Sequence, residues 1–219
     1  MNPVPFILLA ITLPLLLGGC GGEKHEGVNE DEELVHDYRF FKYLKGSNTP
    51  YTGKAFQLYG SGKKKSEANY KDGKYHGVKT NWYHNGEKES EENYKDGKLN
   101  GLVTGWHAIG QKRKYEKNYN DGKQEGLAIS WYLNGQKEME GHYKDGKRNG
   151  LYQEWYGNGQ KRTSFETDQQ DVYWTSWHDN GQKRWEYKIK DGKMSEKWWN
   201  SKGEPVESVE DRWKRNNNP

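Results

Sequence analysis

One short turn recurs five times in this chain, and its spacing constrains the fold more than any other feature. YKDGK stands at 70–74, 94–98 and 143–147, with close copies at 119–123 (YNDGK) and 189–193 (IKDGK). Aligned, these copies give a 24-residue unit, Y-x-D-G-K-x-x-G-x-x-x-x-W-x-x-N-G-x-K, followed by a polar stretch. Copies begin near 45, 70, 94, 119, 143, 165 and 189, and the first and last are degenerate, as terminal repeats often are.

The turn dipeptides divide each unit into two strands. Asp-Gly and Asn-Gly favour two-residue type I′ hairpin turns, because both central residues of such a turn need positive φ. In the unit at 72–95, Asp72-Gly73 and Asn85-Gly86 are then turns, while 74–84 and 87–95 are strands. No residues remain for a helix. The sequence therefore predicts an all-β fold, an elongated single-layer antiparallel β-meander of about seven 24-residue repeats with two strands each.

These turns also predict which residues face each other across strands. The register pairs a glycine with a tyrosine three times: Gly53 with Tyr70, Gly77 with Tyr94, and Gly126 with Tyr143. A ring lying over a cross-strand glycine compensates for the glycine's weakness in a sheet. In a later copy the pair becomes Val172 opposite Ile189, an exchange of volume that contact across strands predicts.

Two copies depart from the register. The third has one extra residue between Gln111 and Tyr119, which predicts a β-bulge that returns Tyr119 to Gly101. The fifth is two residues short between Trp155 and Phe165, and its Asp-Gly turn is lost. We expect a kink or a changed twist there.

Alternation along the strands places one tryptophan per repeat on a common face. These are Trp82, Trp106, Trp131, Trp155 and Trp177, together with Val78, Leu102, Leu127, Ile129 and Leu151. Pointing the other way are Tyr83, His107, Tyr132, Tyr156 and His178. The predicted partners of the tryptophans are Glu89, Arg113, Glu138, Arg162 and Arg184, whose stems can cover the rings and whose guanidinium groups can stack on them. Two interpretations stay open: structural packing in a one-layer sheet, or an exposed stacking platform that makes the tryptophan row a candidate binding surface.

Composition excludes an ordinary globular core and a nucleic-acid-binding domain. From Cys20 onward the chain holds 18 Ile, Leu and Val and 4 Phe, too few for such a core, whereas the full chain has ten Trp and sixteen Tyr. Apolar burial must therefore come from aromatic rings and long charged stems. The 35 basic and 32 acidic residues are interleaved, which predicts a mixed solvated surface and no nucleic-acid partner.

The N-terminus resembles a bacterial lipoprotein signal peptide. MNPVPFILLAITLPLLLGGC has an apolar run from Phe6 to Leu17 and ends in Leu17-Gly18-Gly19-Cys20, although no Lys or Arg precedes Phe6. The run is too short for a transmembrane anchor. The resemblance implies cleavage after residue 19, lipidation of Cys20, and a bacterial cell-envelope protein that is lipid-anchored to a membrane, the outer one in a Gram-negative cell. The chain has no second cysteine, so a disulfide is excluded.

These observations predict four segments. Residues 1–19 are the signal peptide, and residues 20–44 hold the lipidated cysteine and an acidic tether with room for a first strand. The tether prediction rests on residues 21–37, which carry seven acidic residues and one Lys and should be flexible. Residues 45–211 form the repeat sheet, and residues 212–219 form a polar C-terminal tail.

No pattern in the chain indicates catalysis. The seven histidines are scattered, no His/Cys/Asp group has metal-ligand spacing, and no glycine loop leads into a helix. The aspartates of the Asp-Gly turns stand alone beside lysines, whereas calcium loops cluster several carboxylates. Turn formation explains them better, and the sequence predicts no enzyme, no metal and no cofactor.

The repeat resembles the MORN-repeat variant. Residues 50–77, PYTGKAFQLYGSGKKKSEANYKDGKYHG, and the later G-x-x-x-x-W-Y-x-N-G-Q-K units carry the resemblance, which covers about 45–205. This glycine-aromatic repeat occurs in many bacterial proteins, including those labelled YwqK-family antitoxins. The resemblance implies a single-layer sheet that serves as an interaction surface without enzymatic activity, and the antitoxin label implies neutralisation of a toxin. A lipid-anchored protein could act so only on a target met outside the cytoplasm.

Two functions follow. The first is a membrane-tethered protein-interaction module, with an antitoxin or immunity role as its specific form. The alternative is a surface lipoprotein that binds cell-wall or other glycans through its aromatic rows. The sequence gives no indication of the oligomeric state.

Overall fold

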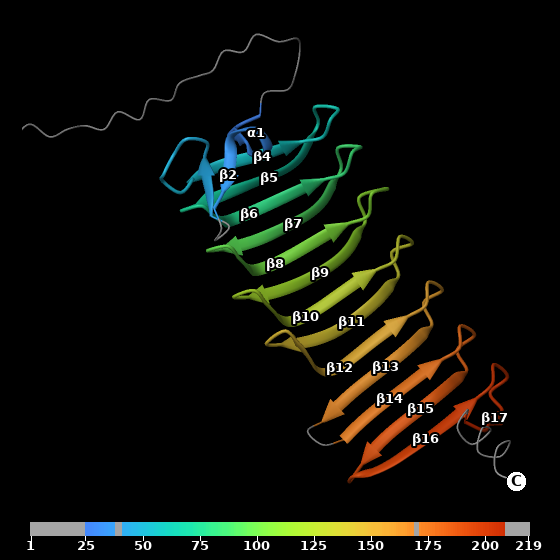
Figure 1. Ribbon diagram of the computed structural model, residues 1–219. Helices are drawn as coiled ribbons and strands as arrows, with labels where there is room; N and C mark the ends of the chain where they lie inside the picture. Colours follow the sequence, from blue (N-terminus) through green and yellow to red (C-terminus); the bar gives the residue numbers. More distant parts are fainter. Residues whose placement is uncertain (1–24, 38–40, 169–170, 209–219) are drawn as a thin grey trace, which may run out of the picture.

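A single long antiparallel sheet forms the body of the protein. The computed structural model describes residues 25–37, 41–168 and 171–208. Within them, fifteen strands form one sheet in the order β1, then β4 to β17 in chain order, so that almost every strand pairs with its neighbours in sequence (Figure 1). Among the strands of this described part, only the pairing of β1 with β4 is parallel. The predicted all-β, single-layer antiparallel meander is confirmed.

Each repeat contributes one hairpin, and most of the strands hold seven to nine residues, whereas the first strand of the series holds six and the last holds two. The repeat strands are β4 (Gly53–Leu58), β5 (Lys64–Lys71), β6 (Lys74–Trp82), β7 (Lys88–Lys95), β8 (Lys98–Trp106), β9 (Arg113–Asn120), β10 (Lys123–Trp131), β11 (Lys137–Lys144), β12 (Lys147–Trp155), β13 (Lys161–Asp168), β14 (Asp171–Trp177), β15 (Lys183–Lys190), β16 (Lys193–Trp199) and β17 (Pro205–Val206).

The two turn dipeptides form different turns. Asp72 and Gly73 both have positive φ, at 49° and 77°, as a type I′ turn requires. At the other end of the hairpin the prediction of a second type I′ turn was wrong, because only Gly86 has positive φ. Tyr83 N–H donates to the Glu87 carbonyl and Gly86 N–H to the Tyr83 carbonyl, both at 2.9 Å, which closes a three-residue loop ending in a bulge.

The wider loop shifts the pairing of the tryptophans by one residue. Four predicted partners were wrong, because Trp82, Trp131, Trp155 and Trp177 face Lys88, Lys137, Lys161 and Lys183. The pairing of Trp106 with Arg113 is confirmed. Beyond the bulge the predicted register returns, and the pairs Gly53–Tyr70, Gly77–Tyr94, Gly101–Tyr119, Gly126–Tyr143 and Val172–Ile189 are all confirmed.

The extra residue of the third copy lies in a loop and not, as predicted, in the strand that follows. His107 N–H donates to the Lys112 carbonyl at 2.9 Å, so this loop holds four residues where the other copies hold three. Gly110 and Gln111 both take positive φ there. A loop absorbs the residue without breaking any hydrogen bond between strands.

The repeat glycine marks a second irregularity, which the fifth copy has lost. Tyr70 pairs with Tyr75 and Ala68 with Lys79, so the segment 76–78 bulges opposite a single residue. Its central Gly77 has φ 91°. Strands β8, β10 and β12 bulge in the same way, but β13 and β14 pair without interruption from Thr163–Ser176 to Asp168–Asp171. The two missing residues are therefore bulge residues of β14, and the position predicted between Trp155 and Phe165 was wrong.

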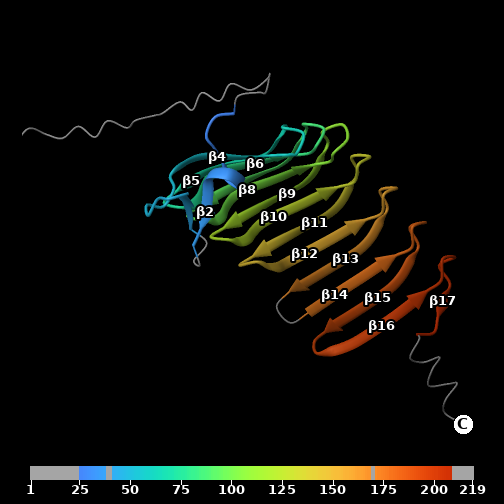
Figure 2. The ribbon, with the colours of Figure 1, turned by 45° about the horizontal axis from the view of Figure 1, so that its top comes forward.

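An N-terminal segment lies against one face of the first strands (Figures 1 and 2). It comprises β1 (Val28–Asn29), the one-turn helix α1 (Glu30–Glu33) and β2 (Leu34–His36), which pairs with β3 (Lys42–Leu44). Leu34 packs on Ala55, Ala68 and Tyr70 in the hydrophobic core cluster.

The prediction of a flexible tether was wrong for residues 28–36. Its acidic side chains find polar partners, because Glu30 pairs with Lys42 at 2.9 Å and Asp31 accepts a hydrogen bond from Gln57 at 2.8 Å. Cys20, the signal-peptide residues and the C-terminal tail lie outside the described residues. None of the described helices is long and apolar enough to span a membrane.

Candidate interaction surfaces

The predicted tryptophan row lies on one face of the sheet, here called the tryptophan face. Trp82, Trp106, Trp131, Trp155 and Trp177 are all half-buried. Lysines lie over most of the rings: Lys64 over Trp82 at 5.3 Å, Lys88 over Trp106 at 5.8 Å, Lys137 over Trp155 at 5.2 Å, Lys161 over Trp177 at 6.0 Å and Lys183 over Trp199 at 5.6 Å. The expected stacking of arginine on these rings does not occur among the described residues, and lysine takes that place.

All but one of these five lysines also form an ion pair with a carboxylate. The bulge after each loop brings residues i and i+3 to the same face, so Lys64 pairs with Glu67 at 2.6 Å and Lys183 with Glu186 at 2.7 Å. The same pairs are Lys88–Glu91, Arg113–Glu116 and Lys137–Glu140. The hydrogen bond from Lys183 lowers the pKa of Glu186. These contacts between tryptophan rings, cations and carboxylates support the packing interpretation of the tryptophan row.

An exposed apolar stripe runs beside the tryptophans. Val78, Leu102, Leu127 and Leu151 occupy equivalent positions at the bulges and are 37–44% exposed. Val78 pairs with Asn93 and Leu102 with Asn118, which places them on the tryptophan face as predicted. The stripe leaves this face available for contact with a partner.

The residue after each tryptophan binds the next repeat. Tyr83 Oη donates to the Trp106 carbonyl at 2.8 Å, and His107 Nε2 lies 2.8 Å from the Trp131 carbonyl. The same bond joins Tyr59 to Trp82, Tyr132 to Trp155, Tyr156 to Trp177 and His178 to Trp199. Either tyrosine or histidine can occupy this position, because both place a polar ring atom within reach of that carbonyl. This ladder explains two of the seven histidines without any catalytic role.

The opposite face, here called the tyrosine face, carries rings that lie over small residues. A Cβ added to Gly105 would overlap the ring of Tyr115, and one added to Gly141 would lie 2.7 Å from Tyr152. The predicted ring-over-glycine contact was wrong for Gly126, since no atom lies within 4 Å of its added Cβ, and for Gly77, whose added Cβ meets only Asn69. At Gly53 the nearest ring is that of Tyr51. The contact is real, but it belongs to other glycine–tyrosine pairs.

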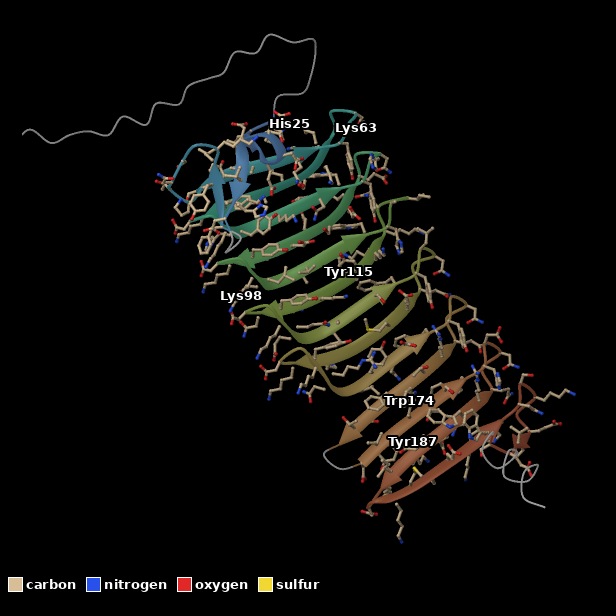
Figure 3. The ribbon with its side chains drawn as sticks, viewed as in Figure 1. His25, Lys63, Lys98, Tyr115, Trp174 and Tyr187 are labelled. Carbon is tan, nitrogen blue, oxygen red and sulfur yellow. The ribbon has the colours of Figure 1, made fainter. Side chains whose placement is uncertain are left out.

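At its C-terminal end the tyrosine face carries a contiguous cluster of large rings. We name Phe165, Trp174, Trp185, Tyr187 and Trp198 the C-terminal aromatic patch. Phe165 lies 5.8 Å from Trp174, which lies 5.3 Å from Trp185. Trp185 in turn contacts Tyr187 at 5.8 Å and Trp198 at 5.6 Å. Figure 3 shows Trp174 and Tyr187 on the face that also carries Tyr115, and Trp174 is 42% exposed.

This patch breaks the repeat. The position of Trp198 is held in earlier repeats by Asn81, Gly105, Ser130, Glu154 and Ser176, and that of Trp174 by Lys79, Val103, Ala128 and Tyr152. Except for Tyr152, small, aliphatic or polar side chains therefore suffice for the sheet. Indoles at these positions add apolar surface, which is exposed at Trp174 and half-buried at Trp198.

A hollow beside the patch brings charged groups among the rings. It measures about 360 Å³ and is lined by Arg148, Tyr152, Glu154, Thr163, Phe165 and Trp174. The Arg148 guanidinium stacks 3.6 Å from the Tyr152 ring, and the Tyr152 hydroxyl donates to Glu154 at 2.7 Å. Burial first, and then this hydrogen bond, raise the pKa of the Tyr152 hydroxyl above its ordinary value.

The sequence prediction named the tryptophan row and missed the C-terminal aromatic patch. The missed signal was the departure of Trp174, Trp185 and Trp198 from the repeat pattern, which the sequence alone displays. No group of three His, Cys, Asp or Glu side chains in the described part of the chain could hold a metal ion. No protein-family model matches the chain, and no curated protein matches it.

Proposed function

We propose that the protein is a non-enzymatic, membrane-tethered interaction module that binds a protein partner through the C-terminal aromatic patch. The observation that carries this proposal is the contiguous ring cluster, which lies where the repeat pattern breaks. Binding energy in protein interfaces concentrates in a few Trp, Tyr and Arg side chains. The patch offers three tryptophans and one tyrosine, and arginines lie beside it.

The proposed tether would hold the patch away from the membrane. Cys20 stands five residues before His25, and His25 and Tyr187 lie near opposite ends of the sheet (Figure 3). From β4 to β15 there are eleven strand intervals, and at about 4.8 Å each they span roughly 53 Å. A lipid on Cys20 would thus anchor one end and leave the patch at the distal end.

Metabolic labelling with a palmitate analogue tests the anchor. The chain with Cys20 should take up the label and sediment with membranes, whereas a Cys20→Ala chain should do neither. Equal labelling of the two chains would contradict the anchor.

The resemblance to the MORN-repeat variant supports the same class of function. Its specific form is an antitoxin or immunity role against a toxin met outside the cytoplasm. The alternative, glycan binding through aromatic rows, draws on the same exposed rings, because a ring face can stack on a sugar.

Site-specific photo-crosslinking in the native cell tests the protein-binding function. A photoreactive phenylalanine replaces Thr163, which lines the hollow beside Trp174, in one variant and Leu127, on the opposite face, in the other. We expect one discrete protein adduct from position 163 and none from position 127. An adduct from position 127 alone would transfer the function to the tryptophan face. Retention on purified peptidoglycan that Trp174→Ala abolishes, without any protein adduct, would favour the glycan alternative.

A further inference from the structure

Arginines gather around the C-terminal aromatic patch. The described residues include four arginines, of which Arg148 and Arg162 line hollows on its side of the sheet together with Tyr152. Arg148 lines the hollow, and Arg162 lies 5.9 Å from the Tyr156 ring. Arg184 occupies the position of Arg162 one repeat later, because both are the extra residue of the bulge after the loop.

None of these three arginines forms an ion pair within the described part of the chain. The fourth, Arg113, lies on the tryptophan face and pairs with Glu116. Cations on that face are thus almost all neutralised by the repeat, whereas those on the patch side are not. A guanidinium presents a planar fork of donors that fits a carboxylate in two parallel hydrogen bonds.

The nearby carboxylates do not form ion pairs with the guanidinium groups of these three arginines. Glu154 accepts a hydrogen bond from the Tyr152 hydroxyl at 2.7 Å, and Glu138 accepts one from Ser130 at 3.1 Å. The third, Glu196, faces Tyr187 across β15 and β16. Stacking on Tyr152 holds the Arg148 guanidinium in place, so less side-chain entropy is lost when a carboxylate binds it.

The hollow supplies an apolar anchor point between these charges. Rings of Tyr152, Phe165 and Trp174 wall it, and its volume of about 360 Å³ accommodates one large side chain. Rings that surround a pocket with charged groups at its rim are typical of interface hot spots.

The other end of the tyrosine face already holds a segment of matching chemistry. There the acidic segment 30–34 inserts Leu34 against Ala55 and Ala68. Asp31 accepts a hydrogen bond from Gln57 of β4 at 2.8 Å, whereas Glu30 pairs with Lys42 of β3, outside the long sheet. The face thus accepts, within this chain, an acidic stretch anchored by one apolar side chain.

We infer that the partner of the C-terminal aromatic patch is an acidic protein segment, whose carboxylates bind Arg148, Arg162 and Arg184 around one apolar side chain seated in the hollow. This inference rests on the proposed function and specifies the chemistry of its partner.

A displayed library of random twelve-residue peptides, selected on the purified protein, tests it. We expect the selected peptides to carry Asp and Glu on both sides of an aromatic or aliphatic residue. Replacing the three arginines by glutamine should weaken the best peptide about tenfold or more, since a hydrogen bond to a charged group contributes about 1.5–3 kcal/mol. Raising the salt concentration should weaken it as well. The matched control Lys88→Gln, on the tryptophan face, should leave its affinity unchanged.

The outcomes separate the two proposals. If the selected peptides no longer bind the Trp174→Ala and Trp174→Phe variants of the protein but carry no excess of acidic residues, the acidic partner is overturned and the proposed function stands. Peptides indifferent to both Trp174 variants would overturn both. Binding of a labelled oligothymidine that requires the same arginines, with no peptide selected, would replace the protein partner by single-stranded nucleic acid.

Discussion

Glycine has two separate roles in this sheet, and the structure assigns them to different residues. Gly105 and Gly141 provide room, because a tyrosine ring of the neighbouring strand lies directly on each. Gly126, with φ 77°, provides a backbone conformation that other residues adopt only with strain, and its added Cβ would meet open space. The same residue type is therefore required for steric reasons at one position and for backbone reasons at another.

Double mutants distinguish these roles. Gly105→Val should destabilise the protein by about 1–3 kcal/mol through overpacking against Tyr115. Adding Tyr115→Ala should recover part of that loss, because the ring is removed. Gly126→Val should cost about 1–2 kcal/mol through its positive φ, and Tyr143→Ile should recover none of it. Urea denaturation provides the free energies, and strict additivity at the 105–115 pair would contradict the ring contact.

At the scale of elements, hairpin loops are joined from repeat to repeat by side chains. Besides the Tyr/His ladder, Asn134 Nδ2 donates to the Gly157 carbonyl at 2.6 Å, and Asn158 Nδ2 to the Asp179 carbonyl at 2.8 Å. At the opposite edge, Lys98 pairs with Asp121 at 2.7 Å and so links successive Asp-Gly turns. The conserved turn residues within the repeat therefore hold neighbouring repeats together in addition to shaping the turns.

Tyr132→Phe tests the ladder. Loss of the hydrogen bond to the Trp155 carbonyl should reduce the free energy of unfolding by about 0.5–1.5 kcal/mol. Tyr119→Phe serves as the control, because its hydroxyl has no hydrogen-bond partner among the described residues. Equal losses for the two variants, measured in the same urea titration, would argue against a structural ladder.

Strand order, strand faces and most of the register were predictable from the repeat, since turn dipeptides and period-two alternation act locally. The loop conformation at Asn85-Gly86 was not, because Asn-Gly fits both a two-residue turn and a three-residue loop, and hydrogen bonds to the next repeat decide between them. The docked segment around Leu34 was also missed, because its acidic composition suggests disorder unless its cationic partners are known. The C-terminal aromatic patch was not predicted, because its rings come from four different strands at positions that do not recur in the repeat, and only the folded sheet brings them into contact.

The N-terminal segment should stabilise its own neighbourhood only. In a repeat protein each unit contacts its neighbours, so stability is close to one-dimensional. Leu34→Ala should therefore speed hydrogen exchange in β4 and β5, where Leu34 packs, and leave β14 to β16 unchanged. Uniformly faster exchange along the whole sheet would instead indicate a single cooperative unit.

At the scale of the whole molecule, the single layer makes the protein longer than a compact domain. Fourteen intervals between fifteen strands, at about 4.8 Å each, span roughly 67 Å. A compact chain of 219 residues would have a radius of gyration of about 17 Å. Small-angle scattering should give a clearly larger value and an elongated distance distribution, with circular dichroism dominated by strand. A globular profile would contradict this architecture.

Recurring and exceptional residues lie in different surroundings in this architecture. Most recurring tryptophans pack under lysines, and most of those lysines pair with carboxylates, which supports a role in the sheet. The exceptional tryptophans cluster on the other face beside arginines that form no ion pair in the described part of the chain, and we propose that they serve recognition. The central claim is that these two sets separate stability from binding.

The most direct measurement compares Trp106→Ala with Trp174→Ala, recording thermal unfolding and capture of the partner that crosslinks near the patch. Trp106→Ala should lower stability, by less than the roughly 3–5 kcal/mol of a fully buried ring, and retain capture. Trp174→Ala should lose capture while stability falls by about 1 kcal/mol or less. The reverse pattern, with capture lost in Trp106→Ala and kept in Trp174→Ala, would contradict the account.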